Sequence, residues 1–262
     1  MTIRLSEGLR NMMAQGYGLA RALHRGYIEV YSGVQPLGAD LTNAGSTKLG
    51  IITLASGGLT KETRATATLT VTGGSGTLTG VTVGTLPIVM DPGLVVWATS
   101  TTVTAALIRD AINRSGIARA SSAAAVVTVE APPGTGTAWN GLALAAAGIT
   151  CTGSNFASGI ANVNGLYLDQ PAAGVITKPA GIVWSCNAIA TGTAGWFRFF
   201  SSNTSDSGIA IATLGEPLTM HARMDGSCGV GTGDLQLSNL SFVSSPASPH
   251  TVDAATFTMP AA

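Results

Sequence analysis

The side chains that most often bind metals or move protons are few and scattered in this chain. Its histidines are His24, His221 and His250, and none has a second ligand at the spacing of a metal site. No Gly-x-Ser-x-Gly elbow is present, and the local sequence suggests no Ser/His or Cys/His pair. We therefore expect each histidine to be solvated or hydrogen-bonded, and we expect no catalytic residue, no metal site and no cofactor.

Paired carboxylates would indicate a sugar-cleaving enzyme, because such an enzyme needs two of them about 5–10 Å apart in a cleft. In the aromatic-rich second half of the chain, before its tail, the candidates are Asp206, Glu216, Asp225 and Asp234. Each stands beside Gly, Ser or Pro, which is typical of turns. We therefore expect four turn residues, and a protein that is not an enzyme.

The glycine-rich runs and the cysteines show no pattern of a phosphate-binding loop, a zinc site or a disulfide framework. The glycine-rich runs at 73–76, 134–136 and 229–233 lack the Lys-Ser/Thr of a phosphate loop, and none precedes a helix, so we expect turns between strands. The cysteines, Cys151, Cys186 and Cys228, are odd in number and have no short spacing, which fits neither a zinc site nor a disulfide framework. We expect three buried thiols.

The charge content of the chain is low. Of 262 residues, 10% are charged and the formal net charge is +0, where about a quarter charged is usual. Near-zero net charge removes the repulsion between copies, which a protein meant to assemble tolerates best. No window of about 18 residues is apolar enough to span a membrane, and the first residues do not read as a secretion signal, so we expect no membrane association.

The N-terminal segment, residues 4–25, carries apolar side chains close to helical spacing, interrupted near Gly16 and Gly18. Its polar side is rich in arginine. A basic amphipathic helix can lie on a membrane or on nucleic acid, or it can pack on its own β-domain or on a neighbouring subunit, and we favour packing. The residues of this predicted assembly arm are Arg4, Leu5, Leu9, Arg10, Met12, Leu19 and Leu23.

The densest aromatic cluster, residues 193–202, predicts the central strand of a packed β-domain, because large side chains occupy both of its faces. The best partner is the segment at 27–33, where Ile28 and Val30 alternate with larger or charged side chains. The predicted core-strand residues are Trp196, Phe197, Phe199 and Phe200.

Between these two strands lies a block that we interpret as an inserted α+β module, Ig-like in class, at residues 57–168. A helix is predicted at 104–113, with Thr104 as its N-cap and Gly116 just past its end. Its strands are predicted at 65–72, 78–83, 86–90, 94–98, 126–130 and 142–152, with 153–165 as the return linker.

Residues 1–56 and 169–262 are then one discontinuous domain that carries the insert. Short strands separated by Gly, Ser or Pro turns are typical of a β-sandwich or jelly roll, so we expect a mainly β fold with a short N-terminal helix. Its later strands are predicted at 174–177, 181–190, 209–213, 218–223, 235–243 and 251–259.

The opening of the chain carries a recognisable order of motifs. Arg-Leu-Ser-Glu-Gly-Leu-Arg-Asn at 4–11 leads to Ile-Glu-Val-Tyr-Ser-Gly-Val-Gln-Pro at 28–36, then to Ala39-Asp40 and to Leu-Gly-Ile-Ile-Thr-Leu at 49–54. This order resembles the opening of small virion proteins of tailed bacteriophages. The likeness covers residues 1–55 and, more loosely, the aromatic strand and the C-terminal tail. It implies a place in the virion, with other phage structural proteins and copies of itself as partners.

The insert has a resemblance of its own. Its Ala-Ala-Leu-Ile-Arg-Asp-Ala-Ile-Asn helix at 105–113, and the strand before Ala-Pro-Pro-Gly-Thr-Gly at 131–136, are similar to α+β modules inserted in phage tail and sheath proteins.

Three functions follow from these patterns. The first is structural: a head decoration or cementing protein, or a tail-associated protein, that acts through protein–protein contacts. The second is adhesion to host-surface glycans, with Trp97, Trp139 and Trp184 as stacking platforms in place of core residues. The third, contact of the basic arm with packaged DNA, offers only a few salt-sensitive phosphate contacts, so nucleic acid is the least favoured partner.

Overall fold

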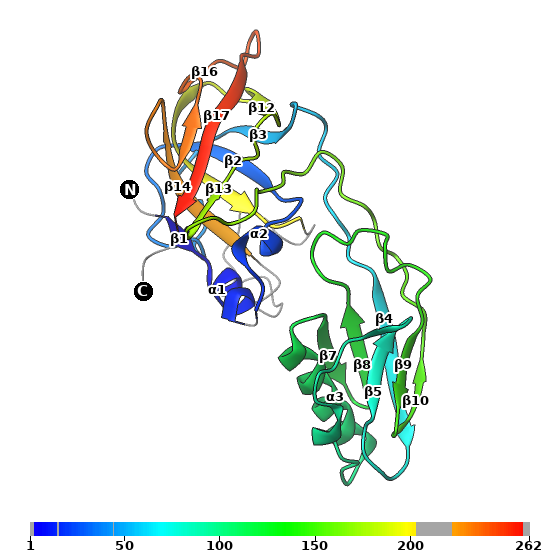
Figure 1. The fold of residues 1–262 in the computed structure, drawn as a ribbon. Coiled ribbons are helices and arrows are strands. Elements are labelled where there is room, and N and C mark those ends of the chain that lie inside the picture. The colour runs from blue at the N-terminus through cyan, green and yellow to red at the C-terminus, as the bar shows by residue number, and fades with distance from the viewer. Residues whose placement is uncertain (1–2, 15, 44, 203–221, 259–262) are drawn as a thin grey trace. The chain divides into compact units, whose positions relative to one another are not determined.

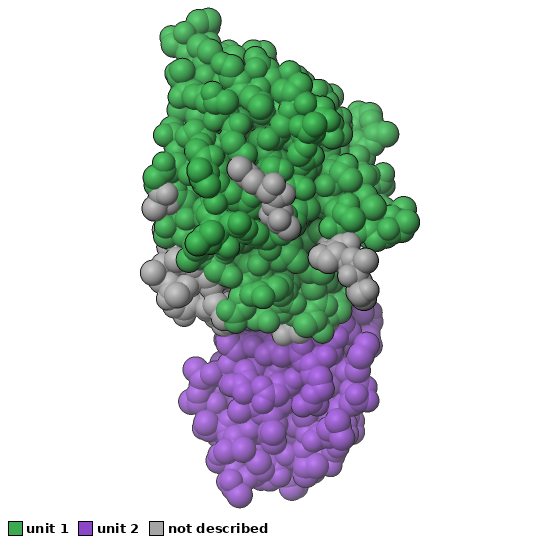
Figure 2. Space-filling model, turned by 90° about the vertical axis from the view of Figure 1, so that its left-hand side faces the viewer, with its two compact units in different colours: residues 1–61, 162–262 green, residues 62–161 purple. Residues whose placement is uncertain are grey.

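The structure is a computed structural model that describes residues 3–14, 16–43, 45–202 and 222–258. The chain divides into two compact units: unit 1 comprises residues 1–61 and 162–262, and unit 2 comprises residues 62–161 (Figure 2). The boundaries expected from the sequence were 56/57 and 168/169. The fold is mainly β, as predicted.

Unit 1 is built on strands whose pairings close into a barrel-like ring (Figure 1). The ring runs through β14 (Arg223–Gly229), β15 (Leu235–Leu237), β17 (Pro249–Thr258), β12 (Trp184–Asn187), β3 (Lys48–Leu54), β2 (Tyr27–Ser32) and β13 (Gly192–Phe200). It closes because β13 also pairs with β14. The β14–β15 pair is parallel, and the other pairs of the ring are antiparallel.

Smaller elements attach to this ring. β1 (Arg4–Leu5) pairs with β14, β11 (Val175–Thr177) with β17, and β16 (Ser241–Phe242) with β13. Helices α1 (Glu7–Ala14) and α2 (Leu19–Ala22) lie side by side at one end of the strands (Figure 1).

The predicted sandwich or jelly roll is not confirmed, because β14 joins β13 to β15 and closes the ring. Residues 223–229 read Arg-Met-Asp-Gly-Ser-Cys-Gly. Glycine and aspartate are depleted in strands, so the pattern did not predict most of this strand. The strand expected at 209–213, and residues 218–221 of the next, lie outside the described residues.

β13 is the central strand that the aromatic cluster predicted, and its predicted partner, β2, is confirmed. Phe197 lies opposite Val30, and Phe199 opposite Ile28, and all four side chains are fully buried in the core of unit 1. This face of the β2–β13 pair therefore forms the centre of that core.

The other face of β13 is buried as well. Trp196 stacks on Tyr31 with ring centroids 4.5 Å apart, and Phe200 stacks on Tyr27 at 5.0 Å. Trp196 Nε1 donates a hydrogen bond to Ser46 Oγ at 3.2 Å. Cross-strand aromatic pairs of this kind stabilise the β2–β13 pairing beyond the area that they bury.

Between the two stacked pairs, Arg198 and Asp225 form a bidentate ion pair that is fully buried. Arg198 Nε and Nη2 donate to the two carboxylate oxygens at 2.6 and 2.7 Å, and Nη1 donates to the main-chain oxygen of Leu41 at 2.9 Å. Burial raises the pKa of the Asp225 carboxyl, and the Arg198 guanidinium opposes this shift because it favours the charged form. The prediction that Asp225 is a turn residue is wrong, since it lies within β14 opposite Arg198.

Unit 2 has two small sheets, one α-helix, a short 3-10 helix and its own core. One sheet has the order β10 (Thr150–Gly153), β4 (Thr66–Gly73), β8 (Val126–Glu130), β7 (Arg119–Ala123), and the other β6 (Leu86–Pro87), β5 (Gly80–Val83), β9 (Leu144–Ala147). Helix α3 (Thr101–Ser115) packs on the first sheet. Leu69, Ile108, Ile112 and Val127 are fully buried in this core. The Ig-like class is not confirmed.

The ends of α3 follow from local chemistry. Ser100 is its N-cap, and Ser100 Oγ accepts from the Val103 amide at 3.2 Å. The predicted cap, Thr104, is instead buried inside the helix, where its hydroxyl donates to the Ser100 carbonyl at 2.9 Å. Gly116 ends the helix with a φ of 66°, as predicted.

Two further details of unit 2 differ from the prediction. The strand expected at 94–98 is absent from the described structure, where a 3-10 helix (Pro92–Leu94) precedes a single bridge between Thr77 and Val96. β7 was not predicted, because its Arg-Ala-Ser-Ser-Ala sequence lacks β-branched and aromatic residues.

The buried ion pair yields a stability prediction. Arg198→Met should lower the free energy of unfolding in urea by about 3–5 kcal/mol, because it leaves the Asp225 carboxylate buried and without its partner. The double variant Arg198→Met, Asp225→Leu should lose clearly less than the single one. Arg109→Met, which breaks the partly exposed pair with Asp110, is the control and should cost less than about 1 kcal/mol. Equal losses in Arg198→Met and in the control would contradict a structural role for the pair.

Candidate assembly surface

The predicted assembly arm forms β1, α1 and α2, and its apolar side packs into unit 1 itself. Leu9, Met12, Leu19 and Leu23 are members of the unit 1 core with 0–3% of their surface exposed. Leu5 is partly buried against the same core. The sequence left open whether the arm packs on its own β-domain or on a neighbouring subunit. These apolar side chains pack on the arm's own β-domain.

The first turn of α1 is fixed by two side chains from outside it. The Ser6 hydroxyl accepts from the Leu9 amide at 3.1 Å and from the Arg223 amide at 3.0 Å, so it caps the helix and ties it to β14. Both carboxylate oxygens of Asp40 accept from the Glu7 amide at 3.0 Å. A carboxylate at a helix N-terminus is stabilised by the helix dipole, and Asp40 brings the segment that follows β2 to this position.

That segment, residues 33–41, is held at three points, and we call it the clamped loop. The Arg4 guanidinium donates to the Pro36 carbonyl, Asp40 binds the start of α1, and Arg198 donates to the Leu41 carbonyl. Two of its residues point inward: Gln35 is 4% exposed and Ala39 is 1% exposed. The conformation of the loop is therefore set by contacts within unit 1.

The clamped loop presents two large apolar side chains to solvent. Val34 is 81% exposed and Leu37 is 87% exposed, more than any other large hydrophobic residue of the described chain. We call this pair the apolar tip. Single exposed hydrophobic residues are ordinary, but here the clamps prevent the loop from turning both side chains into its own core. A pre-organised apolar surface of this kind is suited to a protein partner.

Charged residues of both signs lie in the clamped loop or in the arm beside it. Arg4 and Asp40 are half-buried and bond to the Pro36 carbonyl and the Glu7 amide, and Glu7 and Arg10 are exposed one turn apart on α1. The sequence motifs contain these four charged residues. The exposure of Val34 and Leu37 could not be predicted from the sequence, because a short loop has no periodicity that tells exposed from buried positions.

A further polar group supports the β2 strand that precedes the loop. The Tyr31 hydroxyl donates a hydrogen bond to Glu29, whose other carboxylate oxygen pairs with Lys48 Nζ at 3.1 Å. Burial, together with the nearby Glu29 carboxylate, raises the pKa of Tyr31 far above its ordinary value. This tyrosine stays neutral at physiological pH and acts as a structural donor.

The two described histidines and Asp234 make contacts within the chain, and the His24 ring centroid lies 6.2 Å from that of Tyr167. His250 stacks on Phe242 with ring centroids 3.7 Å apart, and its nitrogens lie 2.8 Å from Ser248 Oγ and 3.1 Å from the Asn239 carbonyl. Asp234, in a bend before β15, accepts from the Ser227 amide at 2.9 Å, which agrees with the predicted turn. His221, Asp206 and Glu216 lie outside the described residues. Within 3–14, 16–43, 45–202 and 222–258, no cluster of His, Cys, Asp and Glu could hold a metal ion.

The cysteines only partly match the expected buried thiols. Cys186 is buried, whereas Cys151 and Cys228 are intermediate, and all three are free. Burial raises the pKa of Cys186 to about 12, so its thiol is protonated and a poor nucleophile at neutral pH.

The glycine-rich run at 134–136 binds a carboxylate, but one from its own chain. The amides of Gly134 and Gly136 donate to the two oxygens of Glu62 at 2.9 and 2.6 Å. Glu62 is fully buried, and Arg64 Nε lies 4.0 Å from it. The run is thus a turn fixed by an internal acceptor.

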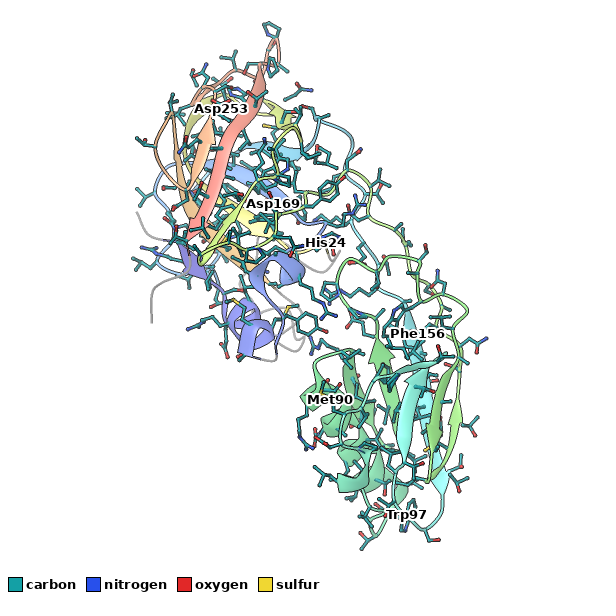
Figure 3. All side chains as sticks on the ribbon, in the orientation of Figure 1. His24, Met90, Trp97, Phe156, Asp169 and Asp253 are labelled. Carbon is teal, nitrogen blue, oxygen red and sulfur yellow. The ribbon has the colours of Figure 1, made fainter. Side chains whose placement is uncertain are left out.

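The three tryptophans proposed as glycan platforms have different environments. Trp184 is fully buried in the unit 1 core, and Trp139 is 8% exposed and packs edge-on against Phe156 at 4.9 Å. Trp97 is half-exposed. In Figure 3, Trp97 and Phe156 lie toward opposite ends of unit 2. Of the three, Trp97 alone offers substantial surface for stacking.

Two arginines of the arm make contacts on the protein surface. The Arg21 guanidinium lies 4.5 Å from the centroid of the Tyr17 ring, and that of Arg25 lies 4.6 Å from the Tyr167 ring. Such cation–π contacts hold the arginines against unit 1.

Comparison of the chain with models of protein families, with curated proteins and with solved structures finds no match. Among the described helices, none has both the length and the apolar content that a membrane crossing requires.

The position of the arm yields a second prediction. Leu9→Ala should lower the free energy of unfolding by about 2–5 kcal/mol, because it removes fully buried methyl groups from the unit 1 core. Arg10→Ala, one residue further on the exposed side of α1, should change it by less than about 0.5 kcal/mol. Urea unfolding of the purified chain measures both. A Leu9→Ala variant as stable as the wild type would mean that the arm does not belong to this core.

Proposed function

We propose that this protein is a structural component of a bacteriophage particle, acting in head decoration or cementing, or at the tail, through protein–protein contacts. The observation that carries the proposal is the apolar tip, which is exposed on a loop whose conformation is already fixed. A rigid apolar surface loses little conformational entropy when a partner covers it.

The virion-like sequence pattern supports the proposal because its separate parts meet in space. Arg4 and Glu7, from the opening motif, contact Pro36 and Asp40, from the Ser-Gly-x-Gln-Pro-x-x-Ala-Asp motif. Together these motifs build the clamped loop and display its tip. The residues of the two motifs therefore hold an exposed loop in place, as a protein that assembles through surface contacts requires. Between head and tail we favour the head, since the chain lacks the repeated or coiled-coil segments of a fibre.

The inserted unit is a further part of the proposal. Its assignment to the Ig-like modules of phage tail and sheath proteins rests on the sequence resemblance of its helix and strand. Its separate core, which includes Leu69 and Ile108, is what an inserted module requires to fold on its own hydrophobic contacts.

The test is the protein composition of the particle. In particles purified from the phage that encodes this chain, mass spectrometry should detect the chain in a fixed ratio to the major head or tail protein. A phage carrying Leu37→Asp should incorporate it several-fold less, since a charge at the tip opposes burial in the contact. Val183→Asp, also at an exposed position of unit 1, is the control and should be incorporated normally. Absence of the wild-type chain from purified particles would refute the proposal.

The alternative function, adhesion to host glycans, retains one supporting observation, the half-exposed Trp97. Under the structural proposal, the purified full chain should show no saturable binding to host cells, and Trp97→Ala should behave as the wild type does. Fluorescence-labelled chain and flow cytometry measure this. Saturable binding that Trp97→Ala abolishes, while Trp139→Phe retains it, would favour adhesion instead.

A further inference from the structure

We infer that Ser248 is an activated nucleophile that accepts the acyl group of small carboxylic esters, with His250 as its base. The local sequence suggested no Ser/His pair, but the structure places these two side chains in contact. The inference goes beyond the proposed function and uses none of its residues. Three observations carry it: the hydrogen bonds of the pair, the packing that fixes the imidazole, and the position of the hydroxyl near the surface.

The hydrogen bonds of His250 determine which of its nitrogens acts as the base. Nδ1 lies 3.1 Å from the main-chain oxygen of Asn239, which can only accept, so Nδ1 carries the proton of the neutral ring. Nε2 then has a lone pair, and it lies 2.8 Å from Ser248 Oγ. Because Ser248 Oγ accepts from the Val243 amide at 3.0 Å, its own hydrogen is left to donate to Nε2. A nucleophile, its base and an acceptor that orients the base are therefore in contact, as serine acyl transfer requires.

Packing holds the imidazole in this orientation. His250 is 1% exposed, and its ring stacks on Phe242 with centroids 3.7 Å apart and planes inclined by 3°. Asn239 is fixed in turn, because its Oδ1 accepts from the Ser241 amide at 2.9 Å. The base is thus pre-organised, and the ring does not have to turn before it takes a proton.

The nucleophile lies nearer to solvent than its base does. Ser248 is half-buried and stands between Ala247 and Pro249, which are both exposed, whereas His250 is buried. The imidazole is therefore shielded from water while the serine remains accessible from outside. A small acyl group, such as acetyl, matches a hydroxyl of this limited exposure.

The acyl transfer balances without a further reactant. Ser248 Oγ attacks the carbonyl carbon of the ester while its proton passes to His250 Nε2. The tetrahedral intermediate then expels the alcohol oxygen of the ester, which takes the proton from Nε2 and leaves as an alcohol. The products are an acyl ester of Ser248, the free alcohol and the neutral histidine.

Acetylation of the purified full chain by p-nitrophenyl acetate tests the inference. Peptide mass spectrometry should find the acetyl group on Ser248 of the wild type, with release of nitrophenolate as it forms. Ser244 is the matched control, because it is also half-buried but its hydroxyl lies 3.1 Å from Thr191 Oγ1 in place of a histidine. Ser248 should be acetylated about a hundredfold or more faster than Ser244, since a positioned general base contributes about 10²–10⁴-fold.

Two variants separate activation of the hydroxyl from its accessibility. His250→Gln should slow the acetylation of Ser248 about a hundredfold or more, because Gln supplies no base. Ser244→Ala should leave the rate at Ser248 unchanged. Circular dichroism melts should show that both variants remain folded, and the comparison of Ser248 with Ser244 in the wild type needs no variant.

Either of two results overturns the inference. One is a wild type in which Ser248 is acetylated no faster than Ser244, and the other is a folded His250→Gln variant that is acetylated as fast as the wild type. The proposed function stands or falls separately, because the presence of the chain in particles and the effect of Leu37→Asp decide it.

Discussion

The buried pair of Arg198 and Asp225 is the interaction on which unit 1 depends. Its carboxylate comes from β14 and its guanidinium from β13, so the pair lies across the strand pairing that closes the ring. A charge removed from water is tolerated only when it is paired and fully hydrogen-bonded. Arg198 meets this condition with two bonds to Asp225 and one to the Leu41 carbonyl. Ring closure and the position of the clamped loop are therefore linked through one side chain.

Burial on both faces of β13 explains why a loop covers the outside of the ring. One face of a barrel strand packs inward, and the other usually meets solvent. Here the outer face carries Trp196, Arg198 and Phe200, which are all fully buried. Covering them requires chain from outside the ring, and the segment between β2 and β3 contributes Leu41 and Ser46 to that task. The part of this segment nearest α1 is thereby held in place with Val34 and Leu37 facing outward.

Unit 2 has a different kind of core from unit 1. Its core is formed by α3 and short strands, with Leu69, Ile108 and Val127 fully buried. One of its loops is fixed by an acceptor far away in the chain, the Glu62 carboxylate, which binds the amides of residues 134 and 136. Both units pair strands that are far apart in the chain, as β4 pairs with β8 and β10 in unit 2, but the unit 2 core is completed by a helix, α3, and not by a closed ring of strands.

The sequence by itself determined the features that depend on local periodicity and on composition. These include the mainly β fold, the break in the arm before Leu19, the end of α3 at Gly116, and the pairing of the aromatic strand with residues 27–32. Only the tertiary structure decided that β14 closes a ring, that Asp225 is buried opposite Arg198, and that Val34 and Leu37 remain exposed. The physical reason is that each of these is set by residues far away in the chain. A Gly- and Asp-containing segment becomes a strand only where a neighbouring strand pairs with it, and a loop residue faces outward only where distant side chains hold the loop in place.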